Sequence, residues 1–277
     1  MIPSVWTDFY PEFTLEETVD SFLAQDLHAS EISLIHLEKL KQRGPAQKVG
    51  AQVASFLCDR GFAIPQGHLT FAGGLVTPES RDEIRRDLDL YLAMGVSNAV
   101  LHFSGGKDLP EAEQFARRLA GVRELCDYVK GTPIYLCLEN LASNPQTITA
   151  ERLRAIMDAV DSPNLAICLD TGHLHLSRGR GDTEQTQRQF IRSAGKDLRA
   201  LHIANNNGTG DDHLMPYSSR RGVDWQEVVR ALREIGYKGL FNLEILAEQH
   251  GPLEIRHAKL KFIRQMLALM LSDEFLS

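Results

Sequence analysis

The sequence predicts an α/β protein whose single domain is a closed (β/α)8, or TIM, barrel. Eight apolar runs of strand length recur along the chain, each is followed by a segment with a helical pattern, and no Ser/Gly/Pro-rich linker divides the 277 residues. Repeated βα units are typical of a parallel sheet, and barrels of this class routinely use about 250 residues as one domain. We therefore expect one barrel domain over residues 1–277.

Each expected strand is an apolar run of strand length that precedes a helical pattern. The eight runs, in chain order, are Pro3–Asp8, Ala29–Ile35, Ala63–Thr70, Ala99–Phe103, Pro133–Glu139, Leu165–Asp170, Ala200–Ile203 and Leu240–Ile245.

The expected helices between these strands have recognisable starts and ends. Thr14, followed three residues later by Glu17, predicts a capping box, and Thr77 precedes a proline at the first helical position. Glycines that tolerate a positive φ close other helical patterns just before the next strand. These glycines are Gly61, Gly95 and Gly236.

Composition excludes several classes of protein. Thirty Lys+Arg against 37 Asp+Glu give a net charge of −7, and 43% of the residues are hydrophobic, which excludes disordered and collagen-like chains and disfavours a nucleic-acid partner. No window approaches the roughly 20 apolar residues of a membrane span, and the N-terminus does not resemble a signal peptide, so we expect a cytoplasmic protein. The cysteines lack CxxC spacing and are expected to be reduced core residues: Cys58, Cys126, Cys137 and Cys168.

Strand alternation predicts which side chains face the barrel interior. In the fifth strand Leu136 and Leu138 would point toward the helices, whereas Cys137 and Glu139 would point inward. The same alternation places three further polar side chains inward at strand ends: Asp170, His202 and Glu244. The C-terminal end of such a barrel holds the active site, so these four side chains are expected at one mouth.

Several carboxylates and imidazoles in one cavity would be costly to bury unless a cation compensates them. We therefore predict a site for a divalent metal such as Mn, Zn, Co, Fe or Mg. Further candidate ligands end strands or follow them: His68, His102, His173, Asp211 and His213. The remaining histidines are expected to be ordinary core or loop residues: His28, His36, His175, His250 and His257.

The order and spacing of five segments resemble the xylose-isomerase-like TIM-barrel superfamily, which contains sugar isomerases and epimerases and the AP endonuclease family 2 domain. The resemblance covers essentially the whole chain. The segments are Leu138-Glu139-Asn140, Leu169-Asp170-Thr171-Gly172-His173, Leu201-His202-Ile203, Asp212-His213-Leu214 with Pro216 and Gly222-Val223-Asp224-Trp225, and Leu243-Glu244-Ile245.

Two branches of this superfamily imply different sites. The ketose epimerase branch implies one ion held by Glu139, Asp170, His202 and Glu244, with His173 contacting the substrate. Glu139 and Glu244 would exchange protons next to a carbonyl through an ene-diolate. The branch of endonuclease IV implies up to three ions. Its ligand sets would be His68, His102 and Glu139; Glu139, Asp170, His202 and Glu244; and His173, Asp211 and His213.

The expected activity is isomerisation or epimerisation of a small sugar or sugar-like polyol. A metal-dependent AP endonuclease remains an alternative, although no basic run exceeds two residues. A dehydratase or lyase and a non-catalytic barrel also remain open, as does homo-oligomerisation.

Side chains near the mouth are candidates for binding the substrate. Glu31 faces inward and would bind a substrate hydroxyl or sit in a hydrated barrel layer. Arginines in the catalytic-face loops could grip an anionic group, and aromatic rings could wall a sugar pocket. These candidates are Arg178, Arg180, Arg220, Arg221, Trp6, Phe9, Phe71 and Phe103.

Overall fold

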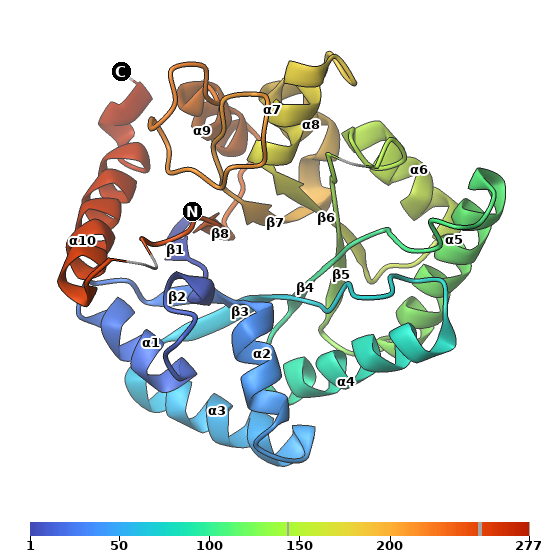
Figure 1. Ribbon diagram of the computed structural model, residues 1–277, viewed down its shortest axis with the longest axis horizontal. Helices are drawn as coiled ribbons and strands as arrows, with labels where there is room; N and C mark the ends of the chain where they lie inside the picture. The colour runs from blue at the N-terminus through green and yellow to red at the C-terminus, as the bar shows by residue number, and fades with distance from the viewer. Residues whose placement is uncertain (143, 249–250, 277) are drawn as a thin grey trace.

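The computed structural model describes residues 1–142, 144–248 and 251–276. Its central strands run parallel and are surrounded by helices, as the view in Figure 1 shows. The expected (β/α)8 TIM barrel is thereby confirmed. Among the described residues, no helix has the length and apolar character needed to cross a membrane.

All eight expected strands are present in the described residues, and most end earlier than the apolar runs. The strands are β1 (Ile2–Val5), β2 (Ala29–Ile32), β3 (Ala63–His68), β4 (Asn98–Leu101), β5 (Tyr135–Glu139), β6 (Leu165–Asp170), β7 (Leu198–His202) and β8 (Leu240–Leu243). The first run is shorter because Thr7–Phe9 turn into a 3₁₀ helix, and the second because Ser33 caps the next helix.

The helices alternate with these strands and form the outer layer. They are α1 (Leu15–Leu23), α2 (Leu34–Lys41), α3 (Ala46–Arg60), α4 (Pro78–Met94), α5 (Glu111–Tyr128), α6 (Ala150–Val160), α7 (Thr171–Arg180), α8 (Gln187–Ala194), α9 (Trp225–Glu234) and α10 (Leu253–Met270). The capping box of Thr14 and Glu17 is present, and Thr77 caps α4 as expected. Gly61, Gly95 and Gly236 all have positive φ.

The barrel closes between the first and last strands of the chain. Strands β2 to β7 form one parallel ladder, and β1 pairs in parallel with β8. An isolated bridge between Ile203 and Leu243 joins β7 to β8. Between β1 and β2, the Ser30 hydroxyl donates a 2.6 Å hydrogen bond to the carbonyl of Val5.

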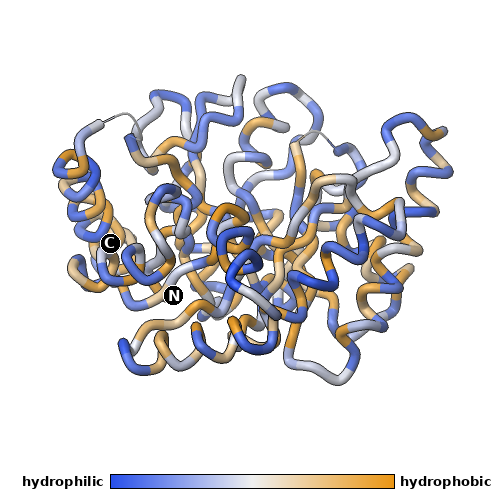
Figure 2. The backbone as a smooth tube through the Cα atoms, turned by 60° about the horizontal axis from the view of Figure 1, so that its bottom comes forward, coloured by the Kyte–Doolittle hydropathy of each residue, from blue (hydrophilic) through white to orange (hydrophobic). Residues whose placement is uncertain are grey.

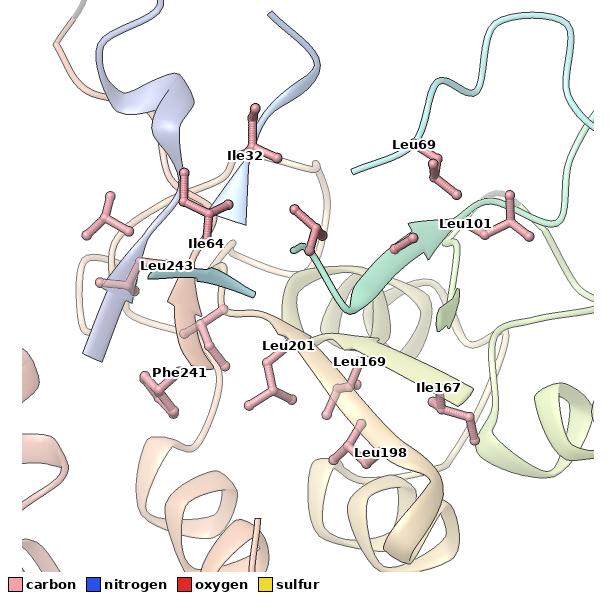
Figure 3. Packing of buried hydrophobic residues seen from close by; sticks show 14 of the residues in the cluster. Ile32, Ile64, Leu69, Leu101, Ile167, Leu169, Leu198, Leu201, Phe241 and Leu243 are labelled. Atoms are coloured by element: carbon pink, nitrogen blue, oxygen red, sulfur yellow. The ribbon is translucent and has the colours of Figure 1, made fainter. Parts of the chain in front are cut away.

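The two faces of the strands build two separate cores, as alternation predicts. Outward-facing residues such as Leu169, Leu201 and Leu243 pack under the helices (Figure 3), and each such burial contributes about 1.5–3 kcal/mol. A smaller cluster fills the barrel interior: Val100, Cys137, Ala166, Cys168 and Ala200. Figure 2 shows hydrophobic backbone through the middle of the molecule and hydrophilic positions along its outer turns. Cys58 is exposed, so the expectation of a core residue was wrong there.

Candidate metal centre and its cavity

Four strand ends bring the expected ligands together at the C-terminal mouth. Glu139, Asp170 and His202 are the last residues of β5, β6 and β7, and Glu244 directly follows β8. Ligand atoms of all four lie within 4.8 Å of one another. The inward orientation predicted by strand alternation therefore produces a compact group of three carboxylates and one imidazole.

The side chains of this group contact one another directly. His202 Nδ1 lies 2.9 Å from Glu244 Oε2 and 3.2 Å from Glu139 Oε1. Asp170 Oδ1 accepts the backbone N–H of His173 at 2.6 Å. Among the described residues, the buried Asp170 Oδ2 has no hydrogen-bond partner. Because an unpaired buried carboxylate oxygen is costly, this atom fits a metal ligand.

A second group shares Glu139 with the first. His102 Nε2 lies 2.8 Å from Glu139 Oε2 and 3.1 Å from His68 Nε2. The ligand atoms of these three residues also lie within 4.8 Å of one another. The structure thus brings together two of the three ligand sets that the sequence suggested.

The third suggested set is looser. Asp211 Oδ2 lies 3.2 Å from His173 Nε2 and 3.6 Å from His213 Nε2. Within residues 1–142, 144–248 and 251–276, the trio is not among the groups whose ligand atoms converge within 4.8 Å. Gly172 lies in the first turn of α7.

Burial and neighbouring charges perturb the ionisable groups of the site. Burial raises the pKa of Asp170 to about 7, against the opposing charge of His173. Burial also disfavours ionisation of Glu139, but His202 and His102 outweigh it and hold its pKa well below the usual range. Burial opposes protonation of His213, but its contact with Asp211 raises the pKa to about 10. The protein therefore surrounds the mouth with strongly interacting charges of both signs.

Glu31 lies beneath the ligands and is fully buried. Its Oε1 lies 3.0 Å from His202 Nε2, and its Oε2 accepts hydrogen bonds from Gln66 and Asn242. A residue with no exposed surface cannot meet a substrate, so the suggestion that Glu31 binds a substrate hydroxyl was wrong.

A cavity of about 670 Å³ opens beside the ligands. It is lined by the segments after β3, β4, β5 and β7 and by α7. The lining side chains include Phe71, His102, Lys107, His173, Arg180 and Asp211. Its volume and its position beside His102 and His173, which both contact Glu139, suit a small substrate.

The aromatic walls match the expectation in part. Phe103 is fully buried and packs edge-to-face against Phe115, so its proposed place in the substrate pocket was wrong. Phe71, also among the expected rings, lines the cavity, with 47% of its surface exposed and its ring stacked 4.7 Å from His102. Trp6 stacks on His213 and donates its indole N–H to the carbonyl of Ile245.

The cations at the cavity match the expectation in part. Arg220 and Arg221 are exposed and do not line this cavity. Arg180, one of the expected arginines, lines it together with Lys107. Sequence reasoning missed Lys107, whose position five residues after His102, in the loop that follows β4, could have indicated it. Of the histidines expected to be ordinary, His250 lies outside the described residues.

Comparisons with known proteins agree with this architecture. The family model described as "Xylose isomerase-like TIM barrel" matches residues 23–266. The D-psicose 3-epimerase of Enterocloster bolteae is 29% identical over 146 residues, which are 53% of this chain and 43% of that protein. The D-psicose 3-epimerase of Agrobacterium fabrum is 26% identical over 60% of this chain and 54% of its own. The matches thus span about half the length of these curated relatives.

A solved structure extends the similarity over nearly the whole chain. The D-psicose 3-epimerase of Clostridium cellulolyticum H10, determined with D-tagatose, superposes with a TM-score of 0.81. The superposition covers 98% of this chain and 100% of that one, at 16% sequence identity. At this identity the comparison supports the fold alone.

Proposed function

The chain belongs to the xylose isomerase-like TIM-barrel family, and from this premise we propose that it is a divalent-metal-dependent isomerase or epimerase of a small sugar or sugar-like polyol. The observation that carries the proposal is the buried group of Glu139, Asp170, His202 and Glu244. Glu139 contacts His102 and His173, which line a cavity of about 670 Å³. The curated relatives that are sugar 3-epimerases support the same reaction class. We further propose that residues 1–277 form one domain.

In this proposal the four ligands hold one divalent ion, which would supply a Lewis acid for the charge that develops on the substrate oxygens. The buried and unpaired Oδ2 of Asp170 supports this assignment. His68 and His102, which also converge on Glu139, would hold a second ion. Asp211 and His213 lie in a looser group, and we assign them to the wall of the mouth beside His173.

We assign proton transfer to Glu139 and Glu244, the two glutamates that contact the same imidazole nitrogen of His202. Glu139 and Glu244 approach His202 Nδ1 at 3.2 and 2.9 Å, from β5 and from the end of β8. One carboxylate would take the proton from the carbon next to the carbonyl, and the other would return a proton to that carbon. His173, Phe71 and Arg180 would orient the substrate from the cavity wall.

A metal-dependent AP endonuclease is the second candidate, because His68, His102 and Glu139 form the additional ligand group that its multinuclear site would need. The net charge of −7 weighs against it, since a DNA-cleaving enzyme must neutralise several phosphates. The looser arrangement of His173, Asp211 and His213 weighs against a third ion. A dehydratase would share the first proton abstraction and differ in losing water.

The test begins with elemental mass spectrometry of protein purified without chelators, followed by solvent-deuterium exchange into a panel of ketoses. Glu139→Gln and Glu244→Gln are expected to lower exchange at least about 100-fold, because general acid–base groups typically contribute that much. Glu248→Gln is the matched control, since Glu248 lies in the loop just after β8 but pairs with Lys259 at the surface.

Wild-type exchange in either active-site variant would refute the assignment of the two glutamates. Cleavage of an abasic duplex without exchange into any ketose would favour the endonuclease. Formation of a dehydrated product would instead identify the lyase reaction.

A further inference from the structure

A layer of buried polar side chains lies directly beneath the candidate metal ligands. It contains one residue from each of β1, β2, β3, β7 and β8, and all are fully buried. They are Ser4, Glu31, Gln66, His202 and Asn242. A carboxylate at the centre of such a layer is expensive unless its oxygens accept hydrogen bonds, so the partners of Glu31 indicate what it does.

The amide groups around Glu31 make it a hydrogen-bond acceptor. Gln66 Nε2 donates to Glu31 Oε2 at 2.7 Å, and Asn242 Nδ2 donates to the same oxygen at 2.6 Å. The orientation of the Asn242 amide is fixed from its other side, because the Ser4 hydroxyl donates to Asn242 Oδ1 at 2.8 Å. Primary amide nitrogens only donate, so Oε2 is an acceptor of two hydrogen bonds.

The second oxygen of Glu31 determines which ring nitrogen of His202 points to the candidate metal centre. Glu31 Oε1 lies 3.0 Å from His202 Nε2. Since an ionised carboxylate only accepts, this contact requires the proton on Nε2. A neutral imidazole protonated there presents its lone pair at Nδ1, the nitrogen that faces Glu139 and Glu244.

We propose that Glu31 is a positioning residue that holds His202 in the Nε2-protonated tautomer and aims Nδ1 at the metal. The inference rests on the metal centre of the proposed function and not on the identity of the substrate. Glu31 reaches His202 across the barrel interior and is itself anchored from β3 and β8, so rotation of the ring would break the bond to a fixed acceptor. Such carboxylate–histidine–metal arrangements strengthen metal binding.

Metal affinity tests this role without requiring turnover. We would titrate MnCl₂ calorimetrically into metal-free wild type, E31Q and S30A. E31Q keeps the size of the side chain but removes its charge, and it is expected to weaken Mn²⁺ binding about 10–100-fold. S30A is the matched control: it deletes the buried hydrogen bond from the neighbouring residue of β2 to the carbonyl of Val5 and removes no partner of the Glu31 carboxylate or of His202. Its affinity is expected to stay within about threefold of wild type.

Equal Mn²⁺ affinity in E31Q and wild type would overturn the inference and leave the proposed function standing. An equal loss in E31Q and S30A would also overturn it, because the effect would then be one of general packing. If the wild type itself binds no Mn²⁺, the proposed function fails and the inference fails with it.

If E31Q does not fold, a second measurement tests the proposed tautomer of His202 in the wild type. In zinc-loaded wild type, ¹⁵N-resolved NMR of the His202 ring is expected to find the proton on Nε2 and the metal on Nδ1. A proton on Nδ1 would overturn the inference.

Discussion

His36 couples the stability of the outer layer to pH, although it lies outside the candidate site. It is fully buried on α2, with Nε2 3.3 Å from the Thr18 hydroxyl and Nδ1 3.3 Å from that of Ser33. Burial, assisted by the charges of Lys39 and Arg43 and opposed by Glu16, lowers its pKa to about 4. We therefore expect His36→Gln to change how the free energy of unfolding depends on pH.

The sign and size follow from linkage. In the unfolded chain the pKa of His36 is near 6.5, so His36 is protonated below that pH. In the folded protein His36 stays neutral down to about pH 4, so the unfolded state binds more protons between these pH values. The stability contributed by neutral His36 is complete above pH 6.5 and is lost as pH falls toward 4. A displacement of about 2.5 pKa units corresponds to about 3 kcal/mol in full, and to about 2 kcal/mol between pH 7 and pH 5.

Urea unfolding of wild type and His36→Gln at pH 5, 6, 7 and 8 measures this contribution. On going from pH 7 to pH 5, wild type is expected to lose about 2 kcal/mol more than the variant. Groups that titrate in both proteins cancel in the difference. Between pH 7 and 8 the difference should stay constant, which serves as the internal control. Parallel curves from pH 7 to 5 would refute the reasoning.

Three further outcomes are expected. Chelation of bound metal should lower the thermal unfolding midpoint, and MnCl₂ should restore it. A ligand at a free concentration of 100 times its Kd stabilises the folded state by about 2.7 kcal/mol. An unchanged midpoint would contradict the metal centre. Phe103→Ala should lower the free energy of unfolding by about 3–5 kcal/mol, whereas Phe71→Ala should chiefly raise KM, and the reverse pattern would show that the walls are misassigned. In Gly50→Ala the new Cβ would lie 2.4 Å from Ala93 Cβ, so α3 and α4 must separate at a cost of about 1–3 kcal/mol in urea unfolding; wild-type stability would contradict this.

The positions of the ligands were predictable because strand alternation is a local rule. Once Leu136 and Leu138 are assigned to the helix side, Glu139 must face the interior, and the same reasoning locates Asp170 and His202. The strands could be counted because each apolar run is bounded by turn or helix signals, some of them confirmed in the caps of α1 and α4.

Other features could not be predicted because they depend on contacts between distant segments. The partners of Glu31 include Asn242, which is 211 residues away. Phe103 and Phe71 both follow strand ends, but Phe103 is buried against Phe115 and Arg118 of α5, whereas Phe71 stacks on His102. The loop of Asp211 follows no strand or helix periodicity that would place its side chain.

The pairing of β1 with β8 sets a time at which the metal centre can first exist. The hydrogen bond between Ser4 and Asn242 joins residues 238 positions apart, and at about 5–20 residues per second the ribosome needs roughly 10–50 seconds to make that interval. A nascent chain in which Glu244 has not yet been synthesised lacks one of the four candidate ligands. Without β8, strand β1 also lacks its pairing partner. Under the proposed function, metal loading at the four-ligand site therefore follows synthesis of the last strand.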